Sequence, residues 1–203
     1  AQKEKLQNYE ELIGNYHKKS LEIKESFIKY AQKTEEYLEE IKPVIKEKQE
    51  FFRSLAKRFY PKNASGITVY NNEGENQQRY TIEAKIESDN SDGINNVKIF
   101  CYDMTMLFKG YGHNIKFSFH DSRLFDGIDE KHKAEIFKVV SELFSNTDYQ
   151  YIATVNQNQL NEIKSILTEQ EYKEIIEKNT ILTLTDEDDS EKLLGVKVDV
   201  GYE

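Results

Sequence analysis

Apolar residues recur every seven positions along the first part of the chain, and charged residues fill most of the positions between them. A first heptad set comprises Leu6, Ile13, Ser20, Phe27, Thr34 and Ile41, and a second heptad set comprises Tyr9, Tyr16, Ile23, Tyr30, Tyr37 and Val44. This period indicates a supercoiled helix that needs a partner helix. We therefore predict a coiled-coil arm over residues 1–60, kinked or restarted at Pro43 because proline interrupts helix hydrogen bonding. The tyrosines favour a non-identical, antiparallel partner. The alternative is a long amphipathic helix that lies on its own domain.

The pattern changes after Pro61, and residues 61–203 alternate between strand and helix signals. Residues 66–86 read as a β-hairpin, and residues 94–108 carry apolar side chains at helical spacing. The strand IKFSF, a helix from about Glu130 and the strand YQYIATV then predict a βαβ unit with parallel strands. Two short helices, near residues 159–167 and 169–178, and a closing hairpin of ILTLT and LLGVKVDV complete an α/β fold.

Composition restricts the partners of the chain and its location. The net charge of −9 gives no global basic field for nucleic acid, so DNA would need a local patch. A basic stretch near the end of the arm offers one: Lys42, Lys46, Lys48, Arg53, Lys57, Arg58 and Lys62. The single cysteine, Cys101, excludes an internal disulfide and favours a reducing cytoplasm. No apolar run is long enough to cross a membrane, and no signal peptide opens the chain. Because it begins without methionine, we expect an excised fragment of a longer protein.

Polar residues stand where predicted helices start and where predicted strands end. The run Ser91–Gly93 precedes a helix, and the free N–H groups of a helix N-terminus bind anions. Asp121, within His120–Ser122, follows the strand IKFSF, where a carboxylate can hold Mg²⁺ through water. Asp129 precedes the next helix, and Asn156 follows the strand YQYIATV. Taken singly, each has a simpler interpretation as a helix cap, a polar turn or a strand end.

The order of these elements resembles the C-terminal lobe of an ATP-binding-cassette ATPase head of the SMC (structural maintenance of chromosomes) type. An arm enters a hairpin, SDG opens a helix, and two strands end in polar residues on either side of the helix that Asp129 precedes. More narrowly, GINNVKIFCYD, HDSRLFDGID and YIATVNQNQL resemble domain-of-unknown-function family 2326, at the C-terminus of SMC-like bacterial ATPases. The resemblance covers nearly the whole chain and implies a lobe of the ABC-ATPase type over residues 61–203.

The resemblance implies that two of these sites act across an interface between two heads. Ser91, Asp92 and Gly93 match the signature motif, which in the family contacts the γ-phosphate of ATP held by the opposing head. Asp92 departs from the usual glycine and brings a negative charge near phosphate. Asp129 matches the D-loop aspartate, which reaches across the same interface.

The resemblance also implies catalytic roles for residues at the two strand ends. Asp121 matches the Walker B aspartate that orients Mg²⁺, and Ser122 then stands where the family usually has a catalytic glutamate. Shifted by one residue, the match places His120 at the metal position and Asp121 at the base. In either register hydrolysis is expected to be slow or to use another base. Asn156 falls at the switch histidine, and asparagine can bind a phosphate but cannot take up a proton near neutral pH.

The chain would supply only half of such a site. It contains no GxxxxGK[ST] loop, which cradles the phosphates of ATP. The resemblance therefore implies that ATP and Mg²⁺ bind only in the complete head dimer. Its partners would be an N-terminal lobe that carries Walker A and its own coiled-coil arm, a second head, and DNA. We predict no ATPase activity from the chain alone.

Two alternatives come from other functional classes. One is a non-catalytic scaffold that uses the arm for dimerisation. The other is a metal-dependent phosphohydrolase built on His113, His120, Asp121 and Asp129. The second is disfavoured because the strand-like alternation of IKFSFHD does not suit the helical His-Asp motifs of such enzymes.

Overall fold

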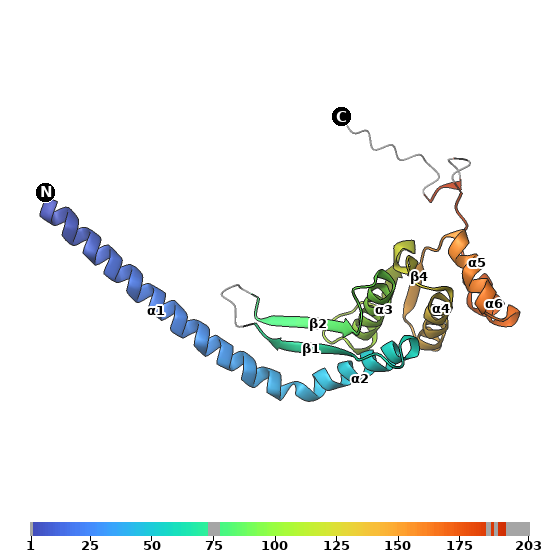
Figure 1. Cartoon of the computed structure of the whole chain (residues 1–203), viewed down its shortest axis with the longest axis horizontal. Helices are drawn as coiled ribbons and strands as arrows, with labels where there is room; N and C mark the ends of the chain where they lie inside the picture. The colour runs from blue at the N-terminus through green and yellow to red at the C-terminus, as the bar shows by residue number, and fades with distance from the viewer. Residues whose placement is uncertain (1, 73–77, 186–187, 189–190, 194–203) are drawn as a thin grey trace. The chain divides into compact units, whose positions relative to one another are not determined.

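The computed structural model describes residues 2–72, 78–185, 188 and 191–193, and these combine helices with small sheets (Figure 1). Contacts divide the chain into two compact units, Ala1–Ile115 and Lys116–Glu203. The predicted arm therefore shares a unit with the elements that follow it up to Ile115. No helix of the described residues is long and apolar enough to cross a membrane.

Two helices form the predicted arm, as the proline indicated. Helix α1 covers Gln2–Glu40, and helix α2 covers Lys42–Phe59. Ile41 separates them, and Pro43 lies in the first turn of α2. A proline is tolerated there because the first N–H groups of a helix have no partner within it. The predicted restart at Pro43 is confirmed.

Strands β1 (Ser65–Asn71) and β2 (Tyr80–Ile86) form the predicted antiparallel hairpin, in which Ser65 lies opposite Ile86. The hairpin packs against α2 and also contacts α1. The Asn71 Nδ2 donates a hydrogen bond to the Ala31 carbonyl oxygen at 2.9 Å, and the rings of Tyr37 and Tyr80 lie 6.5 Å apart.

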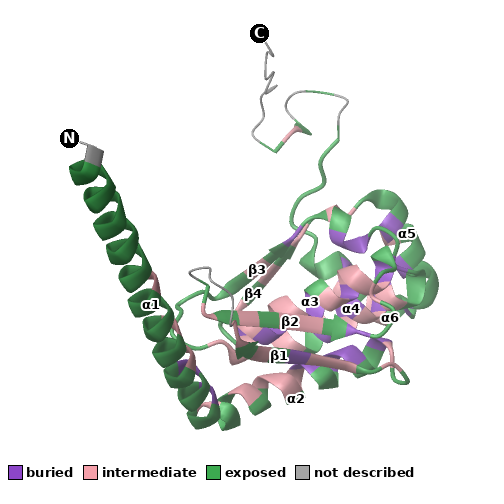
Figure 2. Ribbon diagram, turned by 60° about the vertical axis from the view of Figure 1, so that its left-hand side comes forward, coloured by how far each residue is buried: buried purple, intermediate pink, exposed green. Residues whose placement is uncertain are grey.

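The hairpin covers only one side of the apolar stripe of α1. Thr34, of the first heptad set, and the neighbouring Leu38 are buried, and Phe27 is half-buried. Every member of the second heptad set stays between 47% and 79% exposed: Tyr9, Tyr16, Ile23, Tyr30, Tyr37 and Val44. Figure 2 shows the buried and intermediate positions of α1 toward its α2 end, beside the hairpin. The described residues thus bury part of the first set, which the sequence did not predict, and leave the second set largely exposed apart from contacts of Tyr30 with Arg79 and of Tyr37 with Tyr80.

Helix α3 (Asp92–Lys109) completes the first unit by packing against α2 and β2. The Phe59 and Phe100 rings meet edge to face with centroids 6.0 Å apart. The apolar core of this unit comprises Phe52, Leu55, Ala56, Phe59, Ile67, Ile86, Val97, Phe100, Cys101, Met104 and Leu107. This packing places the N-terminus of α3 at the end of the short connection from β2.

The second unit contains the predicted βαβ arrangement. Strands β3 (Phe117–His120) and β4 (Gln150–Ala153) are parallel, with Phe117 opposite Gln150, and α4 (Glu130–Phe144) lies between them in the chain. A short 3₁₀ helix, η1 (Ser122–Phe125), directly follows β3. Because the strands are parallel, their carboxyl ends lie side by side.

Helices α5 (Gln157–Ile166) and α6 (Glu169–Ile175) pack on α4, and the 3₁₀ helix η2 (Glu177–Asn179) follows. The core of this unit comprises Leu124, Phe125, Ile128, Ala134, Ile136, Phe137, Val139, Ile163, Leu167 and Ile176. Residues 181–185, the first half of the expected closing hairpin, have no regular secondary structure. Most of its second half, residues 194–200, lies outside the described residues.

Candidate functional site

The N-terminus of α3 lacks a side-chain cap from the residue in the capping position. Ser91 occupies that position in an extended conformation, and its side chain accepts no hydrogen bond from the helix. Ser91 and Asp92 are exposed, and Gly93 is buried. The Ser91 side chain therefore leaves the first N–H groups of α3 without a cap from this residue, and such N–H groups can bind an anion. These three residues belong to the first unit, and the other predicted site residues belong to the second.

Asp121 lies exposed at the carboxyl end of β3. Its Oδ1 accepts a hydrogen bond from the Arg123 N–H at 3.0 Å, which caps η1. Its other oxygen has no hydrogen-bond or ion-pair partner among the residues that the structure describes. The carboxylate is therefore both a local cap and a group that can accept a further ligand.

His120 is buried, unlike Asp121, which follows it. It is only 7% exposed, and its Nδ1 lies 3.0 Å from the Tyr151 hydroxyl on β4. The two rings meet edge to face, with centroids 5.5 Å apart. The metal position falls on Asp121 in one register and on His120 in the other. Asp121 is exposed, whereas His120 is buried against Tyr151.

The backbone of Ser122 is held by one side chain of the β4–α5 connection and one of the first turn of α5. The Thr154 Oγ1 accepts a hydrogen bond from the Ser122 N–H at 3.2 Å. The Gln159 Nε2 donates to the Ser122 carbonyl oxygen at 3.1 Å and to the Asp126 Oδ1 at 3.0 Å. The Gln159 Oε1 accepts from the Asn156 N–H at 3.0 Å. The segment after β3 and the segment after β4 are therefore joined through Gln159, which is only 6% exposed.

Asp129 is the N-cap of α4. Its Oδ1 accepts hydrogen bonds from the N–H groups of Lys131 and His132, each at 3.0 Å. Its Oδ2 lies 2.6 Å from the His132 Nδ1. Partial burial would raise the pKa of Asp129, but the hydrogen bonds and the nearby charge of His132, with the bond from Lys131, outweigh it and lower the pKa. The carboxylate stays ionised and occupies the helix N-terminus itself.

Asn156 is the N-cap residue of α5 and is exposed. It follows β4 as Asp121 follows β3, and the structure brings both segments into one hydrogen-bonded group. The sequence placed Asn156 at a strand end but did not predict its link to Ser122 through Gln159. The spacing Asn156-x-x-Gln159, typical of a capping box, was the local signal for the Gln159–Asn156 contact.

The metal-site alternative gains no support from the described residues. No three His, Cys, Asp or Glu side chains among them gather as ligands for a metal ion. Both ring nitrogens of His113 already have backbone partners: Nε2 lies 3.1 Å from the Met106 carbonyl oxygen, and Nδ1 accepts from the Ile115 N–H at 3.3 Å.

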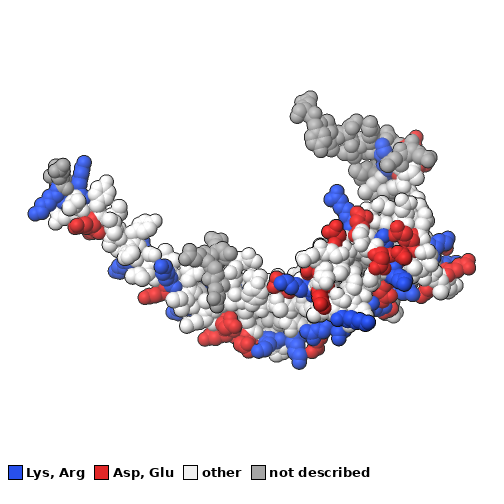
Figure 3. Space-filling view, in the orientation of Figure 1, with Lys and Arg blue, Asp and Glu red and all other residues white. Residues whose placement is uncertain are grey.

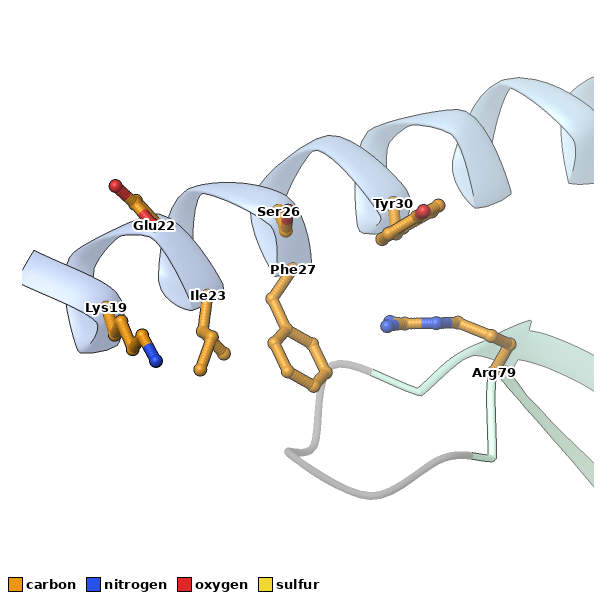
Figure 4. A pocket seen from close by; sticks show the side chains of 7 residues that line it. All are labelled: Lys19, Glu22, Ile23, Ser26, Phe27, Tyr30 and Arg79. Carbon is orange, nitrogen blue, oxygen red and sulfur yellow. The ribbon is translucent and has the colours of Figure 1, made fainter.

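A surface pocket with a volume of about 410 Å³ lies between α1 and the hairpin. Arg79 points toward α1, and its guanidinium carbon lies 4.9 Å from the Phe27 ring centroid and 5.7 Å from that of Tyr30 (Figure 4). Both contacts are within the range of cation–π attraction. The pocket is lined by Lys19, Glu22, Ile23, Ser26, Phe27, Tyr30 and Arg79. None of these is a predicted site residue.

Comparison with known families gives a match over residues 55–198 to the model of the family described as "Uncharacterised protein conserved in bacteria (DUF2326)". The chain belongs to this family. The matched span of the DUF2326 family begins within α2 and includes every predicted site residue. Helix α1 lies outside it.

No curated protein matches the chain. Among solved structures, one described as "Structural biochemistry of ATP-driven dimerization and DNA stimulated activation of SMC ATPases" is similar, with a TM-score of 0.40 and 12% identity. The similarity covers 64% of this DUF2326-family chain and 77% of that chain.

Proposed function

We propose that the chain is the C-terminal half of an SMC-like ATPase head. It would contribute signature, Walker B and D-loop elements to an ATP-sandwiched head dimer that acts on DNA. Residues 1–60 would be the arm and residues 61–203 the lobe, and the single buried Cys101 suits a reducing cytoplasm. The observation that carries this proposal is the pair of parallel strands β3 and β4, whose following segments carry Asp121 and Asn156 and are joined by hydrogen bonds through Gln159.

Asp121 has the properties that a magnesium ligand needs. It is an exposed carboxylate at the carboxyl end of a parallel strand, where α/β folds bind their ligands. Its second oxygen is uncommitted among the described residues, and magnesium prefers oxygen ligands, often through water. When bound, Mg²⁺ neutralises charge on the phosphates during their transfer. Asp121 would orient that ion, and its neighbour Ser122 supplies no carboxylate base.

The other predicted residues would act where two heads meet. The N-terminus of α3, which receives no cap from Ser91, would accept the γ-phosphate of ATP held by the opposing head. Asp129 would face the same interface while it caps α4. Asn156 would bind a phosphate oxygen through its side-chain amide.

This half-site requires partners that supply what the chain lacks. An N-terminal lobe with a Walker A loop would cradle the phosphates, and its own arm would pair with α1. The exposed second heptad set supports a helical partner, because a row of apolar side chains on a long helix needs cover. A second copy of the complete head would close the ATP sandwich.

The proposal predicts a loss of turnover on one conservative change. In the complete head, Asp121→Asn should lower magnesium-dependent ATP hydrolysis by roughly a hundredfold or more, because the neutral amide no longer attracts the ion. Steady-state phosphate release at saturating ATP measures this. The chain alone should release no phosphate.

Asp148→Asn is the matched control, since Asp148 is an exposed carboxylate that pairs with Lys116. It should leave turnover unchanged. Hydrolysis by the purified chain alone would contradict the half-site. Equal turnover in the Asp121→Asn protein and the unaltered head would favour the second candidate function, a coiled-coil scaffold, which the exposed second heptad set also supports.

A further inference from the structure

The Ser122 backbone is held by Thr154 of the β4–α5 connection and by Gln159 in the first turn of α5. Thr154 accepts from its N–H, and Gln159 donates to its carbonyl oxygen. Within this unit, Ser122 is 37 residues before Gln159, so the contact exists only because β3 and β4 are paired. Ser122 directly follows Asp121, and any movement of its peptide would move the Asp121 carboxylate.

The hydrogen-bonding groups of Gln159 are matched to their partners. Its carbonyl oxygen accepts from an N–H that can only donate, that of Asn156. Its amide nitrogen donates to two oxygens that accept, the Ser122 carbonyl and the Asp126 carboxylate. The partners themselves therefore determine the orientation of the amide. A buried side chain that satisfies all of these groups holds a unique arrangement, because any other leaves polar atoms unpaired.

We propose that Gln159, together with Thr154, is a positioning residue that sets the distance between Asp121 and Asn156 in the nucleotide site. This inference rests on the proposed function. Gln159 does not contact the nucleotide; it acts through the backbone of Ser122 and of Asn156. Misplacement of a reacting group by about 1 Å can cost a hundredfold in rate, so loss of this link should be measurable.

The decisive variant is Gln159→Glu, which preserves size and keeps an oxygen for the Asn156 N–H. Its second oxygen would face the Ser122 carbonyl and the Asp126 carboxylate, two acceptors that repel a charged carboxylate. At neutral pH we expect ATP turnover of the complete head to fall at least tenfold. At mildly acidic pH the new carboxyl group should protonate and donate again, because burial and the Asp126 charge raise its pKa. The turnover ratio of variant to unaltered head should therefore recover as the pH falls.

Two further variants separate positioning from a general loss of stability. Gln157→Glu places the same charge two residues earlier, where the Gln157 side chain is exposed and, within the described part of the chain, bonds only to Asn161 on its own helix. It should show neither the loss nor the recovery. Thr154→Val removes the acceptor for the Ser122 N–H at an exposed site and should lower turnover, and Thr154→Ser should restore it.

Amide hydrogen exchange on this 203-residue chain tests the link without nucleotide. In Gln159→Met, exchange should accelerate at Asn156 and Arg123 and stay unchanged in α6. If the unaltered complete head hydrolyses ATP and Gln159→Glu behaves like Gln157→Glu, the positioning role is wrong. If the unaltered head shows no hydrolysis, the proposed function fails and the catalytic part of this inference fails with it. Whether or not the head hydrolyses ATP, unchanged exchange in Gln159→Met would show that Gln159 does not hold the backbone of Ser122 and Asn156 in place.

Discussion

Asp129 uses both of its carboxylate oxygens within its own helix terminus. One accepts two backbone N–H groups, and the other lies against His132. In the proposed dimer, the same carboxylate would also have to contact the neighbouring head. Structural and functional roles at this residue can be separated, because asparagine caps helices about as well as aspartate but carries no charge.

Asp129→Ala should destabilise the chain by about 1 kcal/mol through loss of the cap, and Asp129→Asn should cost much less. Urea denaturation of both variants measures the free energy of unfolding. If Asp129 also acts across the head interface, Asp129→Asn in the complete head should lower turnover without a matching loss of stability. An alanine variant as stable as the unaltered chain would show that the cap contributes nothing.

Among the elements of the second unit, α4 and α6 are joined through one carboxylate. The Glu171 Oε1 lies 2.7 Å from the Lys138 Nζ on α4, and its Oε2 accepts from the Thr168 N–H at 2.9 Å. The hydrogen bond from Lys138, and then those from Thr168, lower the pKa of Glu171 from 4.5 to about 2. Because the folded chain holds the ionised form, this contribution to stability is complete above the unfolded pKa and is lost as pH falls from about 4.5 to about 2.

Glu171→Gln should remove this part of the acid sensitivity. The difference in urea midpoint between the unaltered chain and the variant should be largest near neutral pH and shrink across that acidic window. The effect should be small and should weaken with salt, because both side chains of the pair are partly exposed to solvent. Glu169→Gln, the same change two residues earlier, is the control. A difference that grows toward acidic pH would contradict the assignment.

For the molecule as a whole, acidic groups offset part of the predicted basic stretch. Lys42 pairs with Glu39 at 3.0 Å, and Lys46 lies 3.7 Å from Glu50. Figure 3 shows acidic side chains among the basic ones along α1 and α2 in its view. Within the described residues, the exposed cations without an acidic partner include Lys57 and Lys62. These two are the better candidates for phosphate contacts.

In the complete head, the double variant Lys57→Gln, Lys62→Gln should weaken duplex DNA binding. It should also reduce the slope of log affinity against log salt by about 1 for each phosphate that the protein no longer neutralises. Fluorescence anisotropy at several salt concentrations measures both quantities. The pair Lys42→Gln, Lys46→Gln removes equal charge from partnered lysines and should have the smaller effect. Affinity that does not depend on salt would contradict DNA binding by this stretch.

The sequence by itself determined the elements whose signals are local. The heptad period predicted α1 and α2, and Pro43 predicted the break between them. Alternation predicted the hairpin, and an apolar strand on each side of a helical segment predicted the parallel βαβ unit. The same signals placed Asp121 and Asn156 after strands and Asp129 before a helix. These inferences succeed because periodicity and capping depend on neighbours within a few residues.

Only the tertiary structure decided which side chains meet. The sequence did not show that the hairpin covers one side of α1 and leaves the second heptad set exposed. Nor did it show that His120 engages Tyr151, 31 residues later, while Asp121 remains exposed. The link from Ser122 to Gln159 likewise depends on the pairing of β3 with β4. Such contacts join residues far apart in the chain, and they follow from packing and strand register, which no local pattern specifies.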